Sequence, residues 1–577
     1  MFYNTFEGCI YSMGESVSVS AVAVGSNLLT SEAKANMQQK TKEELVEKAT
    51  YENVGYNFDT VWLINASETA NINYDGAYET YKLVAIGKEL TPDVMPLLDF
   101  LTNVKENLAN NITTYRVTED VVIDLGGAYW ETIAPYDKQP MLASVIVDEG
   151  KSCVIKNFKL KDSNSSFFGY ISGNTLVEGI TFEDVTVESC TAENSAIVAT
   201  GLLNGATLNK ITVKNYAKIT SNAKNVGVIC GVNRGSITNC AVICDELKEL
   251  TVKLSESLTS AGSIVGTNDG YVYNCTVDRV KLCVDVSANR SGSINFGGIV
   301  GTNSSNVSNG KVLSFYCDTT ASGVVYAGGV AGYLTVSSSV NKSYSMANIS
   351  INTSNADAYL GGIAGYVSEN ASIYGCFHES GELKAYYVGG IAGIVYGNAS
   401  VSYVGECQLT GLEVGGISRR ILGKVTDCYV LAVLNGIGSK SVLAGVSVYV
   451  GENAYIEHIF SNASFSGEGR YCAETYSSSR SSKRWKGVID AIGSFNAGTY
   501  KNCIILVNNN ADVEKRDIGI IFSGDFNFNG DFIKVTYEEC TGEVGNYEVF
   551  KDKASFDTNV WNFSEGFPTL KDVVVAE

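Results

Sequence analysis

The sequence predicts an all-β protein folded as a parallel β-helix, a solenoid whose coils stack on one another. The main observation is a glycine-framed phrase that first occurs as Gly227-Val-Ile-Cys-Gly231 and then returns. Its next copies close at Gly266, Gly301, Gly332, Gly365 and Gly393, so the closing glycines lie 35, 35, 31, 33 and 28 residues apart. A period in this range is typical of stacked repeats, in which each repeat covers its neighbours.

The distribution of proline also favours continuous sheets. The chain of 577 residues has only five prolines, and none lies between 141 and 567. Because proline removes a ladder donor from a strand, its absence suits uninterrupted pairing. The predicted strands are short, and the loops between them are too short for helices. A β-propeller is the lesser alternative, since its blades need longer hairpins and about 40–50 residues each.

Changes in periodicity divide the chain into four predicted parts. Residues 1–88 form an N-terminal cap or assembly segment of strands with one short helix, where Thr41-Lys-Glu-Glu44 is a capping-box pattern. Residues 91–111 form a linker helix, because apolar residues recur there at helical spacing. The period becomes two from 112 to 544, which predicts the β-helix, and 545–577 remain as a C-terminal cap.

Charge and hydropathy exclude several classes of function. The net charge is −20, whereas a general nucleic-acid or anionic-membrane binder needs a basic surface. No apolar run reaches the roughly 18 residues of a membrane-spanning helix. The first residues lack the features of a signal peptide, so a signal was removed, the chain begins inside a larger protein, or export follows another route. We expect no nucleic-acid partner and no membrane span.

Cysteines recur at one position of the repeat. Six of the 15 cysteines follow shortly after a glycine phrase: Cys240, Cys275, Cys376, Cys428, Cys503 and Cys540. A recurring position predicts a stacked column, and buried cysteine behaves as a small hydrophobe. Disulfides are the alternative, and a metal site is least favoured because no Cys-x-x-Cys pair occurs. We therefore expect no cofactor.

Several motifs together resemble the GLUG repeats of large bacterial surface proteins. The repeats carry Gly-Gly-Ile-Ala-Gly-Tyr phrases and Asn-Cys strands, while Tyr115–Gly126 and Phe167–Ile171 are similar to the opening strand and first coil of those domains. Phe556-Asp-Thr-Asn-Val-Trp561 with Gly566-Phe-Pro-Thr-Leu570 is similar to their closing cap. The resemblance implies a right-handed parallel β-helix in an exported or surface-anchored protein, and it implies no catalytic residues.

The cap motif occurs twice, which suggests assembly. Phe58-Asp-Thr-Val-Trp62 is similar to the same closing cap, so residues 1–88 resemble the tail of one solenoid placed before another. Because the ends of a β-helix expose unpaired backbone groups, we expect the N-terminal part to dock on a neighbouring copy and build a head-to-tail filament. The alternative is a piece of a longer polypeptide packed on itself. Polymers that persist unchanged after deletion of 1–88 would refute the docking hypothesis.

Enzyme chemistry has little support in the sequence. Polysaccharide lyases and hydrolases occur among β-helices, but glycoside hydrolysis needs two placed carboxylates, and no acidic pair is clustered on consecutive predicted strands. The only two histidines, His378 and His458, are two coils or more apart and are typical of ordinary loop or strand residues. We predict no catalytic residues.

One weak calcium candidate lies near the C-terminus. Its ligands would be Asp525, Asn527, Asn529 and Asp531, which resemble the first half of a calcium loop with a glycine at position six. Position twelve should supply a bidentate carboxylate but is Thr536. An Asn/Gly turn between strands is therefore the favoured interpretation.

One basic stretch is a candidate for protein interaction. It lies within 477–486, where Arg480, Lys483 and Arg484 are candidate contacts for an acidic neighbouring subunit and Trp485 is a candidate anchor. The alternative is a solvated insertion loop, since serine-rich segments are flexible.

Tyrosines form the last candidate surface. Tyr326, Tyr359 and Tyr387 each precede a glycine phrase, so we expect them to stack along one wall. A buried wall belongs to the core, which is the favoured interpretation, whereas an exposed wall would bind sugars or protein.

These observations predict a non-enzymatic structural or adhesive protein, located outside the cell or at its surface. It is a rigid acidic solenoid that forms homo-oligomers or head-to-tail polymers. A carbohydrate- or host-binding adhesin that uses the aromatic wall is the first alternative. A divergent polysaccharide-active enzyme is the least favoured one.

Overall fold

The computed structural model describes residues 97–467 with short gaps, and a few segments outside this range. The gaps are 109–111, 191, 217, 222, 254–259, 286–292, 321–322, 353–356, 439–440, 452 and 462. Outside 97–467 the structure describes β1 (Cys9–Tyr11), β2 (Met37–Gln39), β3 (Trp62–Asn65), β4 (Lys82–Ala85), β53 (Phe495–Asn496), β54 (Thr499–Lys501), β55 (Ile504–Leu506), β56 (Ile533–Val535), and residues 557–562 and 569–571.

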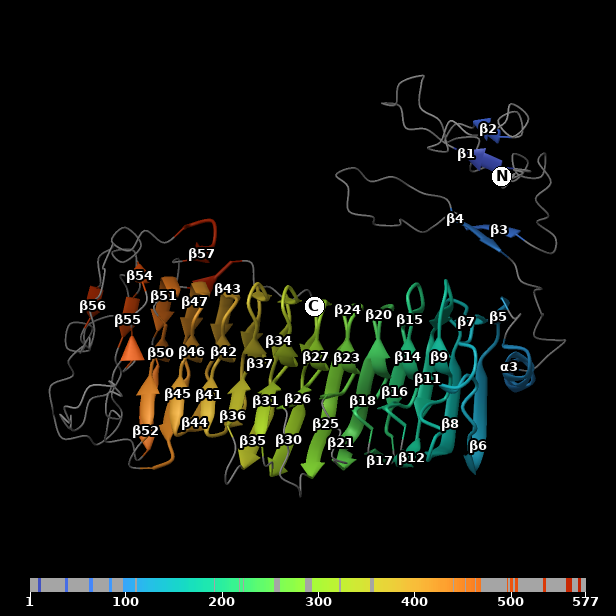
Figure 1. Cartoon of the computed structure of the whole chain (residues 1–577), viewed down its shortest axis with the longest axis horizontal. Coiled ribbons are helices and arrows are strands. Elements are labelled where there is room, and N and C mark those ends of the chain that lie inside the picture. Colours follow the sequence, from blue (N-terminus) through green and yellow to red (C-terminus); the bar gives the residue numbers. More distant parts are fainter. Residues whose placement is uncertain are drawn as a thin grey trace, which may run out of the picture.

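The described coils form a parallel β-helix, which confirms the predicted fold class (Figure 1). Successive coils pair in parallel through sheets of 32, 11 and 9 strands. One coil runs through β31 (Val324–Gly328), β32 (Ala331–Leu334), β33 (Ser339–Asn341), β34 (Tyr344–Ser345) and β35 (Asn348–Asn352). Of these, β31 lies in the nine-stranded sheet, β32 in the eleven-stranded sheet, and the other three in the largest sheet.

The same division holds along the solenoid. The nine-stranded sheet also contains β13 (Asn194–Ser195), β18 (Asn225–Gly227), β22 (Ser260–Gly262), β26 (Ser293–Gly297), β36 (Ala358–Gly361), β41 (Tyr387–Gly389), β45 (Glu413–Gly415) and β49 (Val442–Ala444). The eleven-stranded sheet also contains β53, β9 (Gly169–Ile171), β14 (Ala199–Leu202), β19 (Cys230–Asn233), β23 (Val265–Asn268), β27 (Val300–Asn303), β37 (Ala364–Val367), β42 (Ala392–Val395), β46 (Ser418–Ile421) and β50 (Ser447–Val450). The largest sheet contains β54 to β56 and β5 (Thr114–Val117), β6 (Val121–Tyr129), β7 (Ser144–Val147), β8 (Cys153–Lys161), β10 (Leu176–Glu178), β11 (Ile180–Glu183), β12 (Thr186–Cys190), β15 (Thr207–Asn209), β16 (Thr212–Lys214), β17 (Lys218–Ser221), β20 (Ser236–Thr238), β21 (Ala241–Lys253), β24 (Tyr271–Tyr273), β25 (Thr276–Asp285), β28 (Asn306–Ser308), β29 (Lys311–Val312), β30 (Phe315–Thr320), β38 (Ser372–Tyr374), β39 (Phe377–His378), β40 (Glu382–Lys384), β43 (Asn398–Val404), β44 (Gln408–Gly411), β47 (Lys424–Val430), β48 (Val433–Gly436), β51 (Tyr455–Ser461) and β52 (Ser464–Gly467).

The glycine phrase forms the bend between the nine- and eleven-stranded sheets. Its copies stack in register, since Gly297 pairs with Gly328 and Gly328 pairs with Gly361. The two sheets approach closely at the bend, where a Cβ on Gly332 would lie 2.4 Å from the backbone nitrogen of Phe296. Glycine is therefore required because a side chain would occupy the backbone of the preceding coil.

The interior is apolar, and the cysteine column lies within it. The central Ile or Val of the phrase is fully buried in successive coils: Ile229, Ile264, Ile299, Val330, Ile363, Ile391 and Ile417. Four cysteines, Cys240, Cys275, Cys376 and Cys428, are also buried, and each follows a residue with left-handed backbone: Asn239, Asn274, Gly375 and Asp427. Asparagine tolerates that conformation, which explains the recurring Asn-Cys pair. The cysteines described within 97–467 are free thiols, and Cys503 and Cys540 lie outside the described residues.

A helix covers the N-terminal end of the solenoid. Helix α3 (Leu97–Glu106) lies within the predicted range 91–111 and buries Leu97, Phe100, Leu101 and Val104 against the first coil. The rings of Phe100 and Tyr115 have centroids 5.0 Å apart. The backbone edge at this end is thus shielded (Figure 1). Head-to-tail docking stays a prediction. The N-terminal part of a neighbouring copy would have to dock at the C-terminal end of the solenoid.

The C-terminal Trp motif lies on the side of the solenoid. Strands β57 (Trp561–Asn562) and β58 (Thr569–Leu570) form an antiparallel pair beside β47 (Figure 1). Trp561 is only 1% exposed, its ring centroid lies 6.3 Å from that of Tyr429, and its Nε1 donates a hydrogen bond of 3.0 Å to Asp427. The N-terminal copy of this motif, Phe58–Trp62, lies outside the described residues apart from the strand that begins at Trp62.

An asparagine ladder runs through the largely apolar interior. Asn233, Asn268 and Asn303 are fully buried at equivalent positions of three successive coils. Asn233 Nδ2 donates to Asn268 Oδ1, and Asn268 Nδ2 donates to Asn303 Oδ1, both at 2.7 Å. Leucine occupies the same column on either side of the ladder, at Leu202 and Leu334. The ladder therefore replaces leucine packing with a chain of satisfied amides.

Breaking this ladder at one step should cost more per replaced residue than removing it entirely. We expect Asn268→Leu to lower the free energy of unfolding by about 1–3 kcal/mol, because it leaves amides of Asn233 and Asn303 without their partner. The triple replacement of Asn233, Asn268 and Asn303 by leucine should cost less than three times as much as the single one, since no side-chain amide is left unpaired and only backbone groups such as the N–H of Gly235 and the carbonyl of Ser339 lose a partner. Thermal unfolding midpoints of the two variants test this. A triple variant that loses three times as much as the single one would contradict it.

Candidate ligand-binding groove

The glycine phrase forms the bend between the nine- and eleven-stranded sheets. The side chains just before and just after it face each other on the outer surface of this bend. Tyr326 lies two residues before the phrase Gly328–Gly332 and Tyr333 directly after it, and their ring centroids are 5.3 Å apart. Residues at each of these two positions stack from coil to coil and form a column. We call the surface between the two columns the groove. In the nine-stranded sheet its column reads Asn194, Asn225, Ser260, Asn295, Tyr326, Tyr359, Tyr387 and Glu413. In the eleven-stranded sheet it reads Tyr170, Gly201, Val232, Thr267, Thr302, Tyr333, Tyr366, Ile394, Arg420 and Tyr449.

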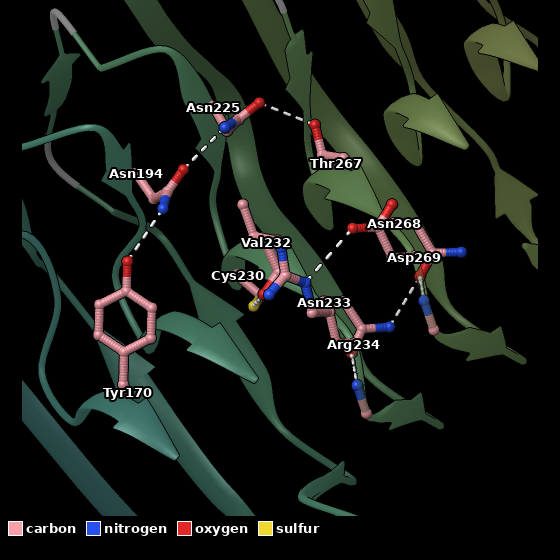
Figure 2. A network of polar contacts seen from close by, with 12 residues as sticks. Tyr170, Asn194, Asn225, Cys230, Val232, Asn233, Arg234, Thr267, Asn268 and Asp269 are labelled. Carbon is pink, nitrogen blue, oxygen red and sulfur yellow. Dashed lines mark hydrogen bonds and ion pairs between the residues drawn. The ribbon is translucent and has the colours of Figure 1, made fainter. Parts of the chain in front are cut away.

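The first part of the groove is lined by a chain of polar contacts. Asn194 Nδ2 donates to the hydroxyl of Tyr170 at 3.0 Å, and Asn225 Nδ2 donates to Asn194 Oδ1 at 2.7 Å. Thr267 Oγ1 donates to Asn225 Oδ1 at 2.8 Å, so the chain crosses from one sheet to the other (Figure 2). Burial raises the pKa of Tyr170, and its hydroxyl therefore stays protonated. Because that oxygen already accepts from Asn194, its proton remains to be donated.

A cavity of about 500 Å³ opens in this polar part. It spans five coils, from Tyr136 and Lys138 of the first to Thr267 and Asp269 of the fifth. The loop that holds Tyr136 closes one end, and its ring centroid lies 5.8 Å from that of Tyr170. The volume is that of a small-molecule site, and an apolar wall with a few converging polar groups is typical of one.

Charged side chains form the rim of the cavity. Lys224 lies 3.5 Å from Glu193. Arg234 lies 3.5 Å from Asp269 (Figure 2). Lys138, from the first coil, is exposed and has no side-chain partner among the described residues. The rim thus has three cations and two carboxylates, in a chain whose net charge is −20.

Tyrosines fill the next part of the groove. On one wall Tyr326, Tyr359 and Tyr387 stack with centroid separations of 5.6 and 5.0 Å. On the facing wall Tyr333 and Tyr366 stack at 4.8 Å with nearly parallel rings. All five are half-buried, and burial raises the pKa of Tyr326 and of Tyr387 to about 12. The predicted stacking is confirmed, but the wall lies on the outer surface and not in the core.

Arginines follow the tyrosines along the groove. The guanidinium of Arg419 lies 4.3 Å from the ring centroid of Tyr387, and its Nε donates to Glu413 at 2.6 Å. The guanidinium of Arg420 lies 4.5 Å from the ring centroid of Tyr449. Such contacts hold both cations against the aromatic faces. The groove therefore changes from amides through tyrosines to arginines within one continuous surface.

The two histidines are strand residues, as the sequence indicated. His378 lies in β39 and is fully buried inside the solenoid, with no hydrogen-bond partner for either ring nitrogen. His458 lies in β51, and its Nδ1 is 3.2 Å from Asp427 Oδ1. Neither histidine lines the cavity, so the structure does not bring them together as an acid–base pair.

The other predicted site residues belong to two segments in the C-terminal part of the chain. The basic stretch with Arg480, Lys483, Arg484 and Trp485 lies outside the described residues, as do the calcium candidates Asp525, Asn527, Asn529 and Asp531. Within the described ranges, no group of three or more His, Cys, Asp or Glu side chains could hold a metal ion. Both interpretations of these segments stay predictions.

The facing column and the cavity were not predicted from the sequence. Tyr333 and Tyr366 directly follow the glycine phrase, so the palindrome-like pattern Tyr-x-Gly-Gly-x-Ala-Gly-Tyr was the available signal. Tyr170, Asn194 and Asn225 occupy the same two positions in earlier coils, where the phrase is less regular. Alignment of the coils on the glycine phrase places these three residues in the same columns as the later tyrosines.

Comparisons with known proteins add no relative, because no family model, curated protein or solved structure matches the chain. In the part of the chain that the structure describes, no helix is long and apolar enough to cross a membrane.

Proposed function

We propose that the protein is a non-enzymatic adhesive rod of the cell surface or extracellular space, and that its groove binds an extended glycan. The cavity in the polar part of the groove is the main support for this proposal. Its polar lining offers hydroxyl and amide groups to sugar hydroxyls, and its aromatic rings offer flat apolar faces to the carbon–hydrogen side of a sugar. The resemblance to GLUG-repeat surface proteins agrees with the proposed location.

The spacing of the coils also suits a polymeric ligand. Paired strands lie about 4.8 Å apart, so equivalent side chains repeat along the groove at that interval. This is close to the length of one sugar unit in an extended glycan. The cavity extends over five coils and therefore has room for several units in a row. A rigid solenoid holds such repeated contacts in place without a cost in ordering the protein.

The two carboxylates at the rim are arranged differently from those of a glycosidase. Glycoside hydrolysis needs one carboxyl group kept protonated by an apolar surrounding and a second that is ionised. Here Glu193 and Asp269 each face a cation at 3.5 Å, and their side chains are 63% and 36% exposed. This supports a binding role over a hydrolytic one.

A glycan array tests the proposal directly. We expect the purified chain to bind at least one class of extended glycan, and Tyr170→Ala with Thr267→Val to weaken that binding by roughly tenfold or more, a loss of about 1.4 kcal/mol. The matched control is Tyr273→Ala with Thr238→Val, which removes the same groups from β24 and β20 on another sheet. Absence of binding to every glycan, or equal loss in both double variants, would overturn the proposal.

A further inference from the structure

We infer that the cavity selects glycans whose sugars carry carboxylate groups over neutral glycans of the same length and linkage. The inference rests on the proposed function and adds the class of ligand. The observation behind it is a local excess of cations and hydrogen-bond donors in a strongly acidic protein.

The cations at the rim are available to a ligand. The pairs Lys224–Glu193 and Arg234–Asp269 are both long, at 3.5 Å, and their side chains are 36–63% exposed. Exposed pairs of this kind contribute little to stability, so a ligand carboxylate can replace the protein carboxylate at small cost. Lys138 has no described side-chain partner to give up. Arg234 also offers the planar fork that matches a carboxylate with two hydrogen bonds.

The hydroxyl of Tyr170 and the spacing of the cations also favour a chain of acidic sugars. The hydroxyl of Tyr170 accepts from Asn194, so it faces a ligand as a donor. The cations come from two separate coils, with Lys138 in the first and both Lys224 and Arg234 in the fourth, while Tyr170 lies in the second. A chain of acidic sugars would place carboxylates at intervals along the groove, where a single small anion would satisfy only one end. A neutral chain would leave these cations without a new partner.

Matched pairs of oligosaccharides give the test. We would measure binding of the full chain to uronic acid oligomers of several linkages, each as the free acid and as its neutral methyl ester, with calorimetry at low and at high salt. We expect the free acid of the linkage that binds to be at least tenfold tighter than its ester. This difference should shrink as salt screens the charges.

Two sets of variants locate the effect. Lys138→Gln, Lys224→Gln and Arg234→Gln together should abolish the preference for the free acid, with an unchanged thermal unfolding midpoint. The control set is Lys156→Gln, Lys159→Gln and Lys214→Gln, which removes three cations that pair with carboxylates on the largest sheet. It should retain the preference, because its charges lie outside the cavity.

The outcomes separate the two proposals. If esters and free acids bind equally well, or if the control set loses the preference as completely as the cavity set, the acidic selectivity is refuted and glycan binding stands. If no oligosaccharide and no glycan of the array binds, both proposals fall together.

Discussion

Replacing Gly365 by alanine should be among the most destabilising single changes in the solenoid. A Cβ at this position would lie 2.4 Å from the backbone nitrogen of Ala327, 2.6 Å from the carbonyl oxygen of Gly332 and 2.7 Å from the carbonyl carbon of Tyr326. All three atoms belong to the backbone of other strands, so no side chain can rotate away. Overpacking usually costs 1–3 kcal/mol, and we expect about 3 kcal/mol or more here because two coils must separate.

The control for this change is another glycine of the same solenoid. An added Cβ at Gly438 meets no atom within 4 Å, so Gly438→Ala should leave the thermal midpoint almost unchanged. Limited proteolysis would show whether the Gly365 variant opens near the bend. Equal midpoints for the Gly365 and Gly438 variants would mean that the bend relaxes easily, and the explanation of the phrase would be wrong.

The second large effect concerns the pH dependence of stability. Burial lowers the pKa of His378 to about 4 from its usual 6.5. In the unfolded chain the imidazole of His378 takes up a proton as the pH falls through 6.5, whereas in the folded chain it does so only near pH 4. The free energy of unfolding therefore decreases between these two values, by roughly 3 kcal/mol in all, and is independent of this group above pH 7.

His378→Val should remove that loss. His378 pairs in register with Val404 of the next coil, so valine has a precedent in the column. We expect the variant and the wild type to have similar midpoints at pH 7.5, and the variant to be more stable by about 2–3 kcal/mol at pH 4.5. Parallel pH profiles of the two proteins would show that His378 takes up its proton at the same pH in the folded and the unfolded chain, and would contradict the assignment.

The fold could be predicted because its signal is local and repeats. The phrase fixes one bend per coil, and the register of Gly297, Gly328 and Gly361 follows the sequence spacing directly. The position of Tyr326, Tyr359 and Tyr387 before the phrase was enough to predict their stacking. Whether the stack faces the core or the solvent could not be predicted in this way. Side chains alternate between inward and outward along a strand, but the bend at the glycine phrase interrupts this alternation.

The cavity could not be predicted in the same way. It depends on side chains from five coils, including Tyr136 and Lys138 of the first. Asn194 and Asn225 are of the same types as the turn residues found throughout the chain, so composition did not distinguish them. His378 illustrates the same limit, because the sequence placed it in a strand or loop and gave no sign that it would be enclosed by neighbouring coils.

The interior thiols give the solenoid a set of natural markers. Burial raises the pKa of Cys153 to about 11 and that of Cys230, Cys376 and Cys407 to about 12, so these groups stay as thiols in the closed coils. A thiol reagent reacts with the thiolate and needs access to it. Each cysteine therefore becomes reactive only when its own coil opens. The order in which they are alkylated during gentle denaturation records whether the stack unravels from one end, from both, or from the middle.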